Sequence, residues 1–139
     1  MKIDRHQARI LAMQSLCQLD AQGDAFLDQV GSFLADAEVS SETTGYANAL
    51  VTNAWTQRES IDAELAVTAS GWTVDRLVPV DRNVLRVALV ELGAGQVPPK
   101  VVINEAIEIA GEYGTGDSGG FVNGVLDAVW KRRSTEGKQ

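Results

Sequence analysis

Cysteine, histidine and long apolar runs are all scarce in this chain, and each scarcity excludes a class of protein. The only cysteine, Cys17, cannot form an internal disulfide, and His6 is the only histidine. The two cannot supply the nitrogen and sulfur ligands of a structural zinc site. No apolar run approaches the ~20 residues of a membrane span, and the first residues lack an apolar signal segment. We therefore expect a cytoplasmic chain without a metal, a cofactor or a membrane contact, in which Cys17 lies on a buried helix face.

Groups that could carry out catalysis are equally scarce. His6 has neither a cysteine nor a second histidine to work with. Glu105 and Glu108 share one helix face, but a pair at this spacing is more often a solvated acidic surface than an acid/base pair. The GTGDSGG segment at residues 114–120 lacks the preceding strand and the following lysine of a nucleotide-binding loop. We therefore expect that the chain is not an enzyme.

Helical periodicity is what the chain does have. Its 139 residues are 45% hydrophobic, which suits one compact domain over residues 1–139. Apolar residues recur at spacings of three and four, and no segment alternates as a strand would. The sequence predicts an all-α, single-domain helical bundle without a fixed-period repeat.

Capping residues and prolines indicate where the helices begin. Asp4 with Gln7 has the form of a capping box, one serine of the pair at 40–41 is a good N-cap, and Asp81 is placed to cap a later helix. Prolines 98–99 fit a first helical turn, where no N–H is needed. The expected helices run over about 4–19, 26–34, 41–55, 61–71, 81–93, 98–114 and from 117 or 118 past 129.

The net charge of −7 argues at first against a nucleic-acid binder, because phosphate contacts usually supply the affinity. The acidic residues, however, concentrate in segments 17–75 and 101–130, and the positive charge gathers at both termini and between Arg76 and Arg86. If the fold brings the basic segments together, they form one basic face on an acidic body. For the basic tail at 131–133 alone, the simpler interpretation is that it complements a helix dipole.

The glycine-rich turn at 114–120 has a second interpretation. Glycines before a helix let backbone N–H groups approach an anion, and the helix dipole favours an anion there. Phe121 follows directly and could stack an unpaired base. Periodicity alone favours Phe121 as a core residue, so both interpretations stay open.

Four segments together resemble one known family. They are RHQARILAMQSLCQLD from Arg5, DRNVLRVALVEL from Asp81, INEAIEIA from Ile103 and FVNGVLD from Phe121. In this order and at these separations they resemble the NusB family, strongly over residues 81–127 and weakly over 20–70. The resemblance implies about seven helices in two subdomains. It also implies an RNA-binding transcription antitermination factor.

The resemblance implies partners and site residues as well. Family members bind the boxA sequence of ribosomal RNA transcripts jointly with NusE, a ribosomal small-subunit protein, within the antitermination complex of RNA polymerase, and so support ribosomal RNA synthesis. The implied RNA-binding residues are Lys2, Arg5, His6, Arg9, Asp117, Ser118 and Phe121. The implied NusE-binding residues are Asp81, Arg82 and Arg86. Their places near helix ends indicate polar, exposed side chains.

The chain departs from the family at several of these places. His6 and Gln7 stand where relatives often carry consecutive arginines, and Gly119–Gly120 replace a turn that is often basic. We therefore expect weak RNA binding by the chain alone and dependence on NusE. One alternative is a protein-interaction or homodimeric module with weak or masked RNA binding, since some family members are dimers. Another is the RNA-targeting domain of a ribosomal RNA cytosine methyltransferase, which requires the sequence to be a fragment.

Overall fold

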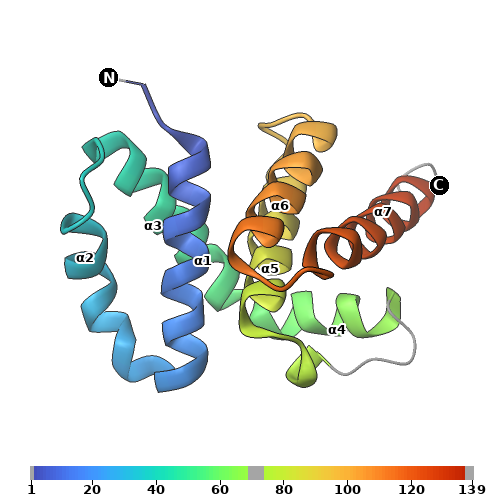
Figure 1. Cartoon of the computed structure of the whole chain (residues 1–139), viewed down its shortest axis with the longest axis horizontal. Coiled ribbons are helices and arrows are strands. Elements are labelled where there is room, and N and C mark those ends of the chain that lie inside the picture. The colour runs from blue at the N-terminus through green and yellow to red at the C-terminus, as the bar shows by residue number, and fades with distance from the viewer. Residues whose placement is uncertain (1, 69–73, 137–139) are drawn as a thin grey trace.

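The computed structural model describes residues 2–68 and 74–136, which form seven α-helices and two short 3-10 helices and contain no strand. Figure 1 shows their arrangement. The α-helices are α1 (Arg5–Gln22), α2 (Leu27–Ala35), α3 (Ser41–Thr56), α4 (Arg58–Thr68), α5 (Pro79–Ala94), α6 (Pro99–Tyr113) and α7 (Ser118–Glu136). The 3-10 helices are η1 (Gly23–Phe26) and η2 (Val74–Arg76). The prediction of an all-α fold with about seven helices is confirmed.

Most of the predicted helix starts are confirmed. Asp4 caps α1 by accepting a hydrogen bond from the backbone of Gln7, and Ser40 caps α3 in the same way through Thr43. Helix α6 begins with Pro99 at its first position, and Gly114 is its C-cap. The predicted end of the fourth helix, near Gly71, lies outside the described residues.

Helix α5 differs from the prediction at both ends. Asp81 does not cap it, because α5 already begins at Pro79 and Asp81 lies in its first turn. Proline fits the first helical position, so the start moves two residues upstream. The helix ends at Ala94 rather than Gly93, because the left-handed turn, with φ of 70°, falls on Gly95.

The core consists of two apolar clusters that share α1 and α5. One cluster joins buried residues of α1, α2 and α3 with Val87 of α5. The other joins Ile10 and Met13 of α1 with buried residues of α4, α5, α6 and α7. Figure 1 shows α1 to α3 on one side of the molecule and α4 to α7 on the other. The expected two helical subdomains therefore correspond to two packed clusters.

Helix α5 is the central element of the fold. It packs against α1, α3, α4, α6 and α7, and Asn83 to Leu89 form an unbroken buried run. A helix that is buried all round has no solvated face on which to place its polar side chains. Asp81, Arg86 and Glu91 must therefore find partners inside the protein.

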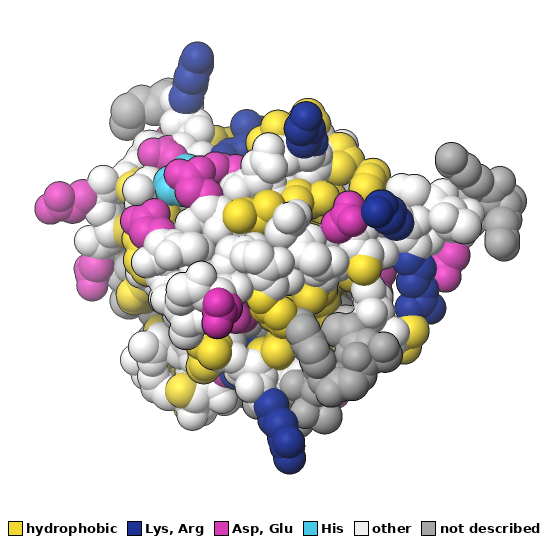
Figure 2. Space-filling model, turned by 45° about the vertical axis from the view of Figure 1, so that its right-hand side comes forward, with side chains coloured by type: hydrophobic (Ala, Val, Ile, Leu, Met, Phe, Trp, Pro, Cys, Tyr) yellow, Lys and Arg dark blue, Asp and Glu magenta, His cyan; other side chains and the backbone are white. Residues whose placement is uncertain are grey.

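The charged surface is mixed. On the face shown in Figure 2, lysine and arginine side chains stand apart from one another, with aspartate and glutamate between them. No described helix is long and apolar enough to cross a membrane. The condition for one basic face, that the basic segments come together, is not met on the face in this view.

The turn between α6 and α7 leaves no room for a side chain at its first residue. A Cβ added at Gly114 would meet Ser118 Oγ, the carbonyl oxygen of Ala110 at 2.7 Å and Ser118 Cβ at 2.8 Å. We expect Gly114→Ala to lower the free energy of unfolding by about 1–3 kcal/mol, since overpacking forces neighbours to shift. Urea denaturation followed by circular dichroism measures the change.

Gly111, one turn earlier on α6, is the matched control. A Cβ at Gly111 meets nothing within 4 Å. Gly111→Ala should stabilise the protein by about 0.5–1 kcal/mol, because alanine loses less backbone entropy in a helix. Equal effects of the two substitutions would contradict the steric account of the turn.

Candidate nucleic-acid interface

A groove lies between the N-terminal part of α1 and the start of α6. Its volume is about 520 Å³, and its polar lining comes from Arg5, His6, Arg9, Gln96, Asn104 and Glu105. The capped first turn of α1 fixes the backbone of Arg5 and His6 at the rim. Arg5 and Lys2 are exposed, and His6 is half-buried. The structure thus places three of the predicted RNA-binding residues, Arg5, His6 and Arg9, in one groove, and Lys2 precedes them in the chain.

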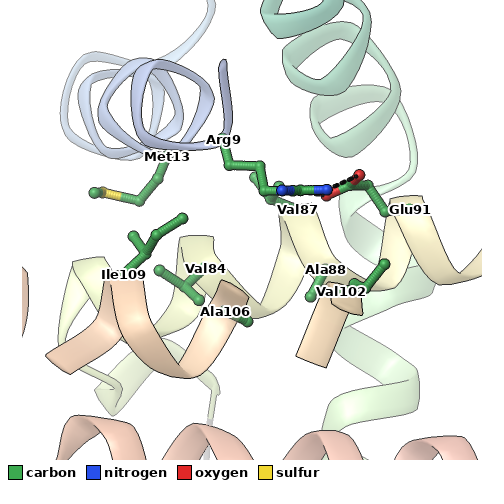
Figure 3. A pocket seen from close by; sticks show the side chains of 9 residues that line it. All are labelled: Arg9, Met13, Val84, Val87, Ala88, Glu91, Val102, Ala106 and Ile109. Carbon is green, nitrogen blue, oxygen red and sulfur yellow. Dashed lines mark hydrogen bonds and ion pairs between the residues drawn. The ribbon is translucent and has the colours of Figure 1, made fainter. Parts of the chain in front are cut away.

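Arg9, one turn further along α1, lines the same groove but is almost fully buried. It is 5% exposed and forms a two-fold hydrogen-bonded ion pair with Glu91 of α5, at 2.6 Å through Nε and 3.0 Å through Nη2. Its Nη1 donates to Glu105 of α6 at 2.8 Å. Figure 3 shows Arg9 reaching from α1 to Glu91 beside a cavity of about 10 Å³. The expectation that Arg9 is exposed is wrong, because its guanidinium is needed to neutralise buried carboxylates.

The same network holds Tyr46 and His6 in place. The hydroxyl of Tyr46 donates to Glu91 Oε2 at 2.6 Å, and His6 Nδ1 lies 3.0 Å from Glu105 Oε1. Burial by itself lowers the pKa of Arg9, but its hydrogen bond to Glu91 and the charges of Glu91 and Glu105 raise it above its ordinary value. Burial and the Glu91 carboxylate both raise the pKa of Tyr46, so the phenol stays protonated and keeps donating.

A group of side chains that lie close enough together to hold a metal ion consists of His6, Glu105 and Glu108. Their ligand atoms lie within 4.8 Å of one another. Glu105 Oε1, however, already accepts from Arg9 and contacts His6. Glu105 is therefore a member of the ion-pair network and not of the solvated acidic face that its sequence spacing favours, whereas Glu108 is exposed.

The turn before α7 places the other three predicted RNA-binding residues apart from the groove. Asp117 is exposed, Phe121 is half-buried against the second core cluster, and Ser118 is buried. Ser118 Oγ accepts from the backbone N–H of Thr115 at 2.9 Å, so its hydroxyl stabilises the turn, and the expectation of an exposed Ser118 is wrong. The interpretation of Phe121 as a core residue is thus confirmed in part, because its ring packs against the core but stays partly exposed.

Helix α6 separates the two groups of residues. The groove lies at its first two turns and the α6–α7 turn lies at its other end (Figure 1). Glu105 and Tyr113 are eight residues apart, and a rise of 1.5 Å per residue puts about 12 Å between them along the axis. An RNA that contacts both groups must run along α6.

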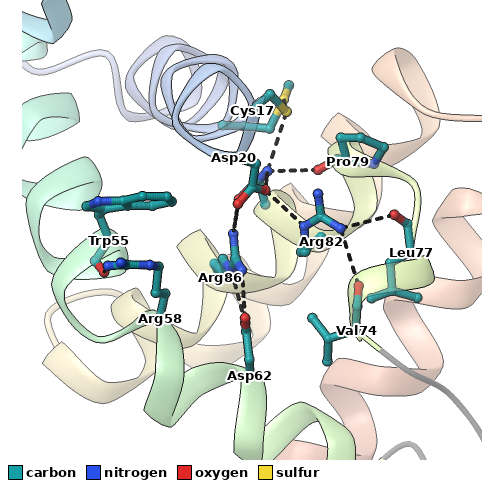
Figure 4. A network of polar contacts seen from close by, with 12 residues as sticks. Cys17, Asp20, Trp55, Arg58, Asp62, Val74, Leu77, Pro79, Arg82 and Arg86 are labelled. Carbon is teal, nitrogen blue, oxygen red and sulfur yellow. Dashed lines mark hydrogen bonds and ion pairs between the residues drawn. The ribbon is translucent and has the colours of Figure 1, made fainter. Parts of the chain in front are cut away.

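Two of the predicted partner-binding residues, Arg82 and Arg86, lie in a second ionic network, drawn in Figure 4. Asp20 of α1 accepts from Arg82 at 2.9 Å, from Arg86 at 2.8 Å and from Asn83 at 2.8 Å. Arg86 also forms a two-fold ion pair with Asp62 of α4. Asn83 further donates to Cys17 Sγ at 3.5 Å, and burial raises the pKa of that half-buried thiol.

Asp81 and Arg86 are buried, which contradicts their expected exposure. Arg86 is 4% exposed and Asp81 is 6% exposed, whereas Arg82 is half-buried. Asp81 Oδ1 has no hydrogen-bond partner among the described residues. A buried acceptor without a donor is costly, so this oxygen lowers the stability of the fold relative to a fully paired site.

The basic tail is paired as well. Lys131 lies 3.0 Å from Asp127, Arg132 lies 3.3 Å from Glu136, and Arg133 binds both oxygens of Glu64 of α4. The tail therefore does not join the N-terminal basic residues in one face. Arg5 is an exposed arginine that lines the groove, and the exposed Lys2 and Lys100 are near its lining residues in the sequence.

Sequence reasoning missed the acidic partners of these arginines. Glu91 is 82 positions from Arg9, and Asp62 is 24 positions from Arg86. Helical periodicity relates residues three or four positions apart, so it carries no signal for such pairs. A charged residue within an otherwise apolar helix stripe, such as Glu91 in VALVELG, was the one available hint.

Loss of Arg9 should leave a buried charge unpaired. We expect Arg9→Met to lower the free energy of unfolding by about 3–5 kcal/mol, because Glu91 stays buried without its partner. Arg5→Met, which removes an exposed arginine, should change it by less than about 1 kcal/mol. In Arg9→Met/Glu91→Met both charges are absent, and part of the loss should be recovered. Denaturant titration measures the free energy of unfolding of each variant. If the loss in Arg9→Met/Glu91→Met equalled the sum of the losses in the two single variants, the pairing would be disproved.

The Asp20 network predicts a pH dependence. Burial by itself raises the pKa of Asp20, but hydrogen bonds from Arg86, Asn83 and Arg82 outweigh it and lower the pKa below its ordinary value. The pairing therefore contributes stability above about pH 4, the usual pKa of a free aspartate, and this stability is lost as the pH falls through the folded value. Asp20→Asn should be less stable at pH 7 and lose less stability between pH 5 and pH 2. Parallel acid-unfolding curves for the two proteins would refute this assignment.

Comparison with known proteins identifies relatives over nearly the whole chain. The family model described as the NusB family matches residues 6–131. A transcription antitermination protein NusB from Anaeromyxobacter dehalogenans is 43% identical over 126 residues, which cover 90% of this chain and 89% of that protein.

Solved structures agree with this result. A NusB structure from T. maritima is 36% identical, with a TM-score of 0.85, and the match covers 94% of this chain and 93% of that one. A chain from a complex of antitermination factors NusB and NusE with double-stranded RNA is 28% identical, with a TM-score of 0.83 over 92% of this chain and 96% of that one. The chain belongs to the NusB family.

Proposed function

We propose that this chain is an RNA-binding transcription antitermination factor that binds boxA RNA of ribosomal RNA transcripts together with NusE. The observation that carries the proposal is its similarity, over nine-tenths of its length, to a transcription antitermination protein NusB. Similarity to a chain from a NusB–NusE–RNA complex supports both partners. In this role the chain acts as one non-catalytic domain in the cytoplasm, within the antitermination complex of RNA polymerase.

The N-terminal groove is the proposed place of RNA binding. Lys2 and Arg5 supply exposed positive charge, and His6 and Asn104 line the hollow beside them. Single-stranded RNA is bound by cationic grooves that follow the backbone. Asp117 and Phe121, beyond the far end of α6, are proposed as a second contact with the same RNA.

The surface around Asp81 is proposed to bind NusE. Asp81 Oδ1 is buried without a hydrogen-bond partner among the described residues, so a local rearrangement on binding that brings a NusE donor to it would favour the complex. Arg82 and Arg86 act through Asp20, which holds the first two turns of α5 against α1. Ser118 and Arg9 are proposed as positioning residues, since neither side chain is exposed.

Weak binding to RNA without NusE is part of the proposal. Four arginines, at positions 9, 82, 86 and 133, bind carboxylates of the chain itself. They cannot neutralise phosphates at the same time. Few phosphate contacts give a small electrostatic contribution, so affinity depends on what NusE adds.

Fluorescence anisotropy with labelled boxA RNA and a scrambled RNA, with and without NusE, tests the function. We expect preference for boxA that tightens when NusE is added. Arg5→Ala should weaken binding to both RNAs by a similar factor and reduce the slope of log K against log salt by about 0.7, the value for one single-strand phosphate contact. Equal binding of the two RNAs under every condition would instead favour the interaction-module alternative.

Arg132→Ala is the matched control for Arg5→Ala. Arg132 is exposed and pairs with Glu136 near the end of α7, away from the groove. The Arg132→Ala substitution removes the same charge as Arg5→Ala, so any effect of net charge alone on RNA affinity appears in both variants. An Arg132→Ala protein that lost as much affinity as Arg5→Ala would argue against a localised RNA groove.

A further inference from the structure

A second hollow, of about 220 Å³, lies between α3 and α5 beside the N-terminal groove. Tyr46 and Asn53 of α3 form one side, and Val90 of α5 lies in its floor. Gln96 and Val97, in the turn between α5 and α6, line both this hollow and the N-terminal groove. A ligand bound in the groove therefore has a neighbouring recess within reach.

The ring of Tyr46 is held rigidly at the wall of this hollow. Its hydroxyl donates to Glu91 at 2.6 Å, and the guanidinium carbon of Arg5 lies over the ring, 5.3 Å from its centroid. The ring remains half-buried rather than enclosed. A fixed, accessible aromatic ring next to an arginine is the pairing that binds unpaired bases, through stacking and through charge.

Two amide side chains at the rim are available for hydrogen bonds. Asn53 and Gln96 are exposed, and their amide groups have no hydrogen-bond partner among the described residues. Each amide both donates and accepts, which suits the mixed donor and acceptor edge of a nucleobase. The apolar floor of Leu50, Val90 and Val97 suits the face of a base.

The one acid in the wall does not oppose RNA. Both oxygens of Glu91 are engaged, since Arg9 binds Oε1 and Oε2 and Tyr46 donates to Oε2. Arg9 neutralises Glu91, and the guanidinium of Arg5 lies over the Tyr46 ring.

We propose that this hollow is a nucleobase site, which receives one unpaired base of a single-stranded RNA whose backbone lies in the N-terminal groove. Tyr46 stacks on the base, Asn53 and Gln96 contact its edge, and Arg5 contacts the adjoining phosphate. This inference rests on the proposed RNA-binding function and adds a base-specific contact to it. A protein side chain as occupant is the competing outcome.

The test uses boxA oligonucleotides in which the fluorescent base 2-aminopurine replaces one base at a time. In the wild-type complex, with NusE present, one position should show strong quenching by stacking. Tyr46→Phe keeps the ring and should retain both the quenching and the affinity. Tyr46→Leu should abolish the quenching and weaken binding by about 5- to 150-fold, the range for losing one stacked base.

The design separates stacking from damage to the fold. Tyr46→Phe and Tyr46→Leu both remove the hydroxyl that donates to Glu91, so they differ in the ring. Asn53→Ala changes an exposed rim residue and should weaken boxA more than scrambled RNA. Asn48→Ala is its control, because Asn48 is an exposed asparagine of the same helix that does not line the hollow.

Each result has a defined meaning. Wild-type protein that shows no preference for boxA, even with NusE, overturns the proposed function and this inference together. Preference for boxA with equal affinity and quenching in Tyr46→Leu and Tyr46→Phe overturns this inference alone. Loss of NusE binding in Tyr46→Leu with unchanged RNA binding assigns the hollow to a protein side chain and likewise overturns it.

Discussion

The ion pair between Arg9 and Glu91 is the contact on which much of this structure depends. It joins α1 to α5, the two helices shared by both core clusters, with donor–acceptor distances of 2.6 and 3.0 Å. Glu105 extends it to α6 and Tyr46 extends it to α3. Because buried charges are stable only when fully paired, these four helices have one arrangement that satisfies all the groups. The same pair fixes the positions of His6 and Tyr46, which border the two hollows at the proposed RNA surface.

Most of the arginines discussed above form ion pairs within the chain and are therefore not available to a ligand. Asp20, Asp62 and Glu64 bind Arg82, Arg86 and Arg133 across α1, α4, α5 and α7. Arg5 supplies exposed positive charge in the groove, and the exposed Lys2 and Lys100 are near its lining residues in the sequence. An acidic protein of this kind gains little from long-range attraction to RNA, so recognition has to come from local contacts and from its partner. The proposed base site at Tyr46 is a local contact of that type.

Much of the fold was predictable because its signals are local. Asp4, Ser40 and Pro99 begin helices through interactions within one turn of the chain, and the spacing of apolar residues gave the helix faces. Phe121 was ambiguous, since a half-buried ring satisfies both the core and the surface interpretations. The candidate site was harder to predict. Arg9, Asp81, Arg86 and Ser118 read as exposed polar residues near helix ends, yet all four are buried. Arg9 and Arg86 pair with carboxylates on helices that are distant in sequence, whereas Ser118 is held within its own turn.

By itself, the sequence determined the seven helices, most of their ends, and membership of the NusB family, because helix capping, helical periodicity and motif order are written in neighbouring residues. Only the tertiary structure decided which charges reach the surface. A guanidinium near the start of a helix can face water or a carboxylate 82 positions away, and the choice follows from which helices pack together. The hollow at Tyr46 was likewise decided by packing, since α3 and α5 supply most of it and meet in the cluster that joins α1, α2 and α3 with Val87.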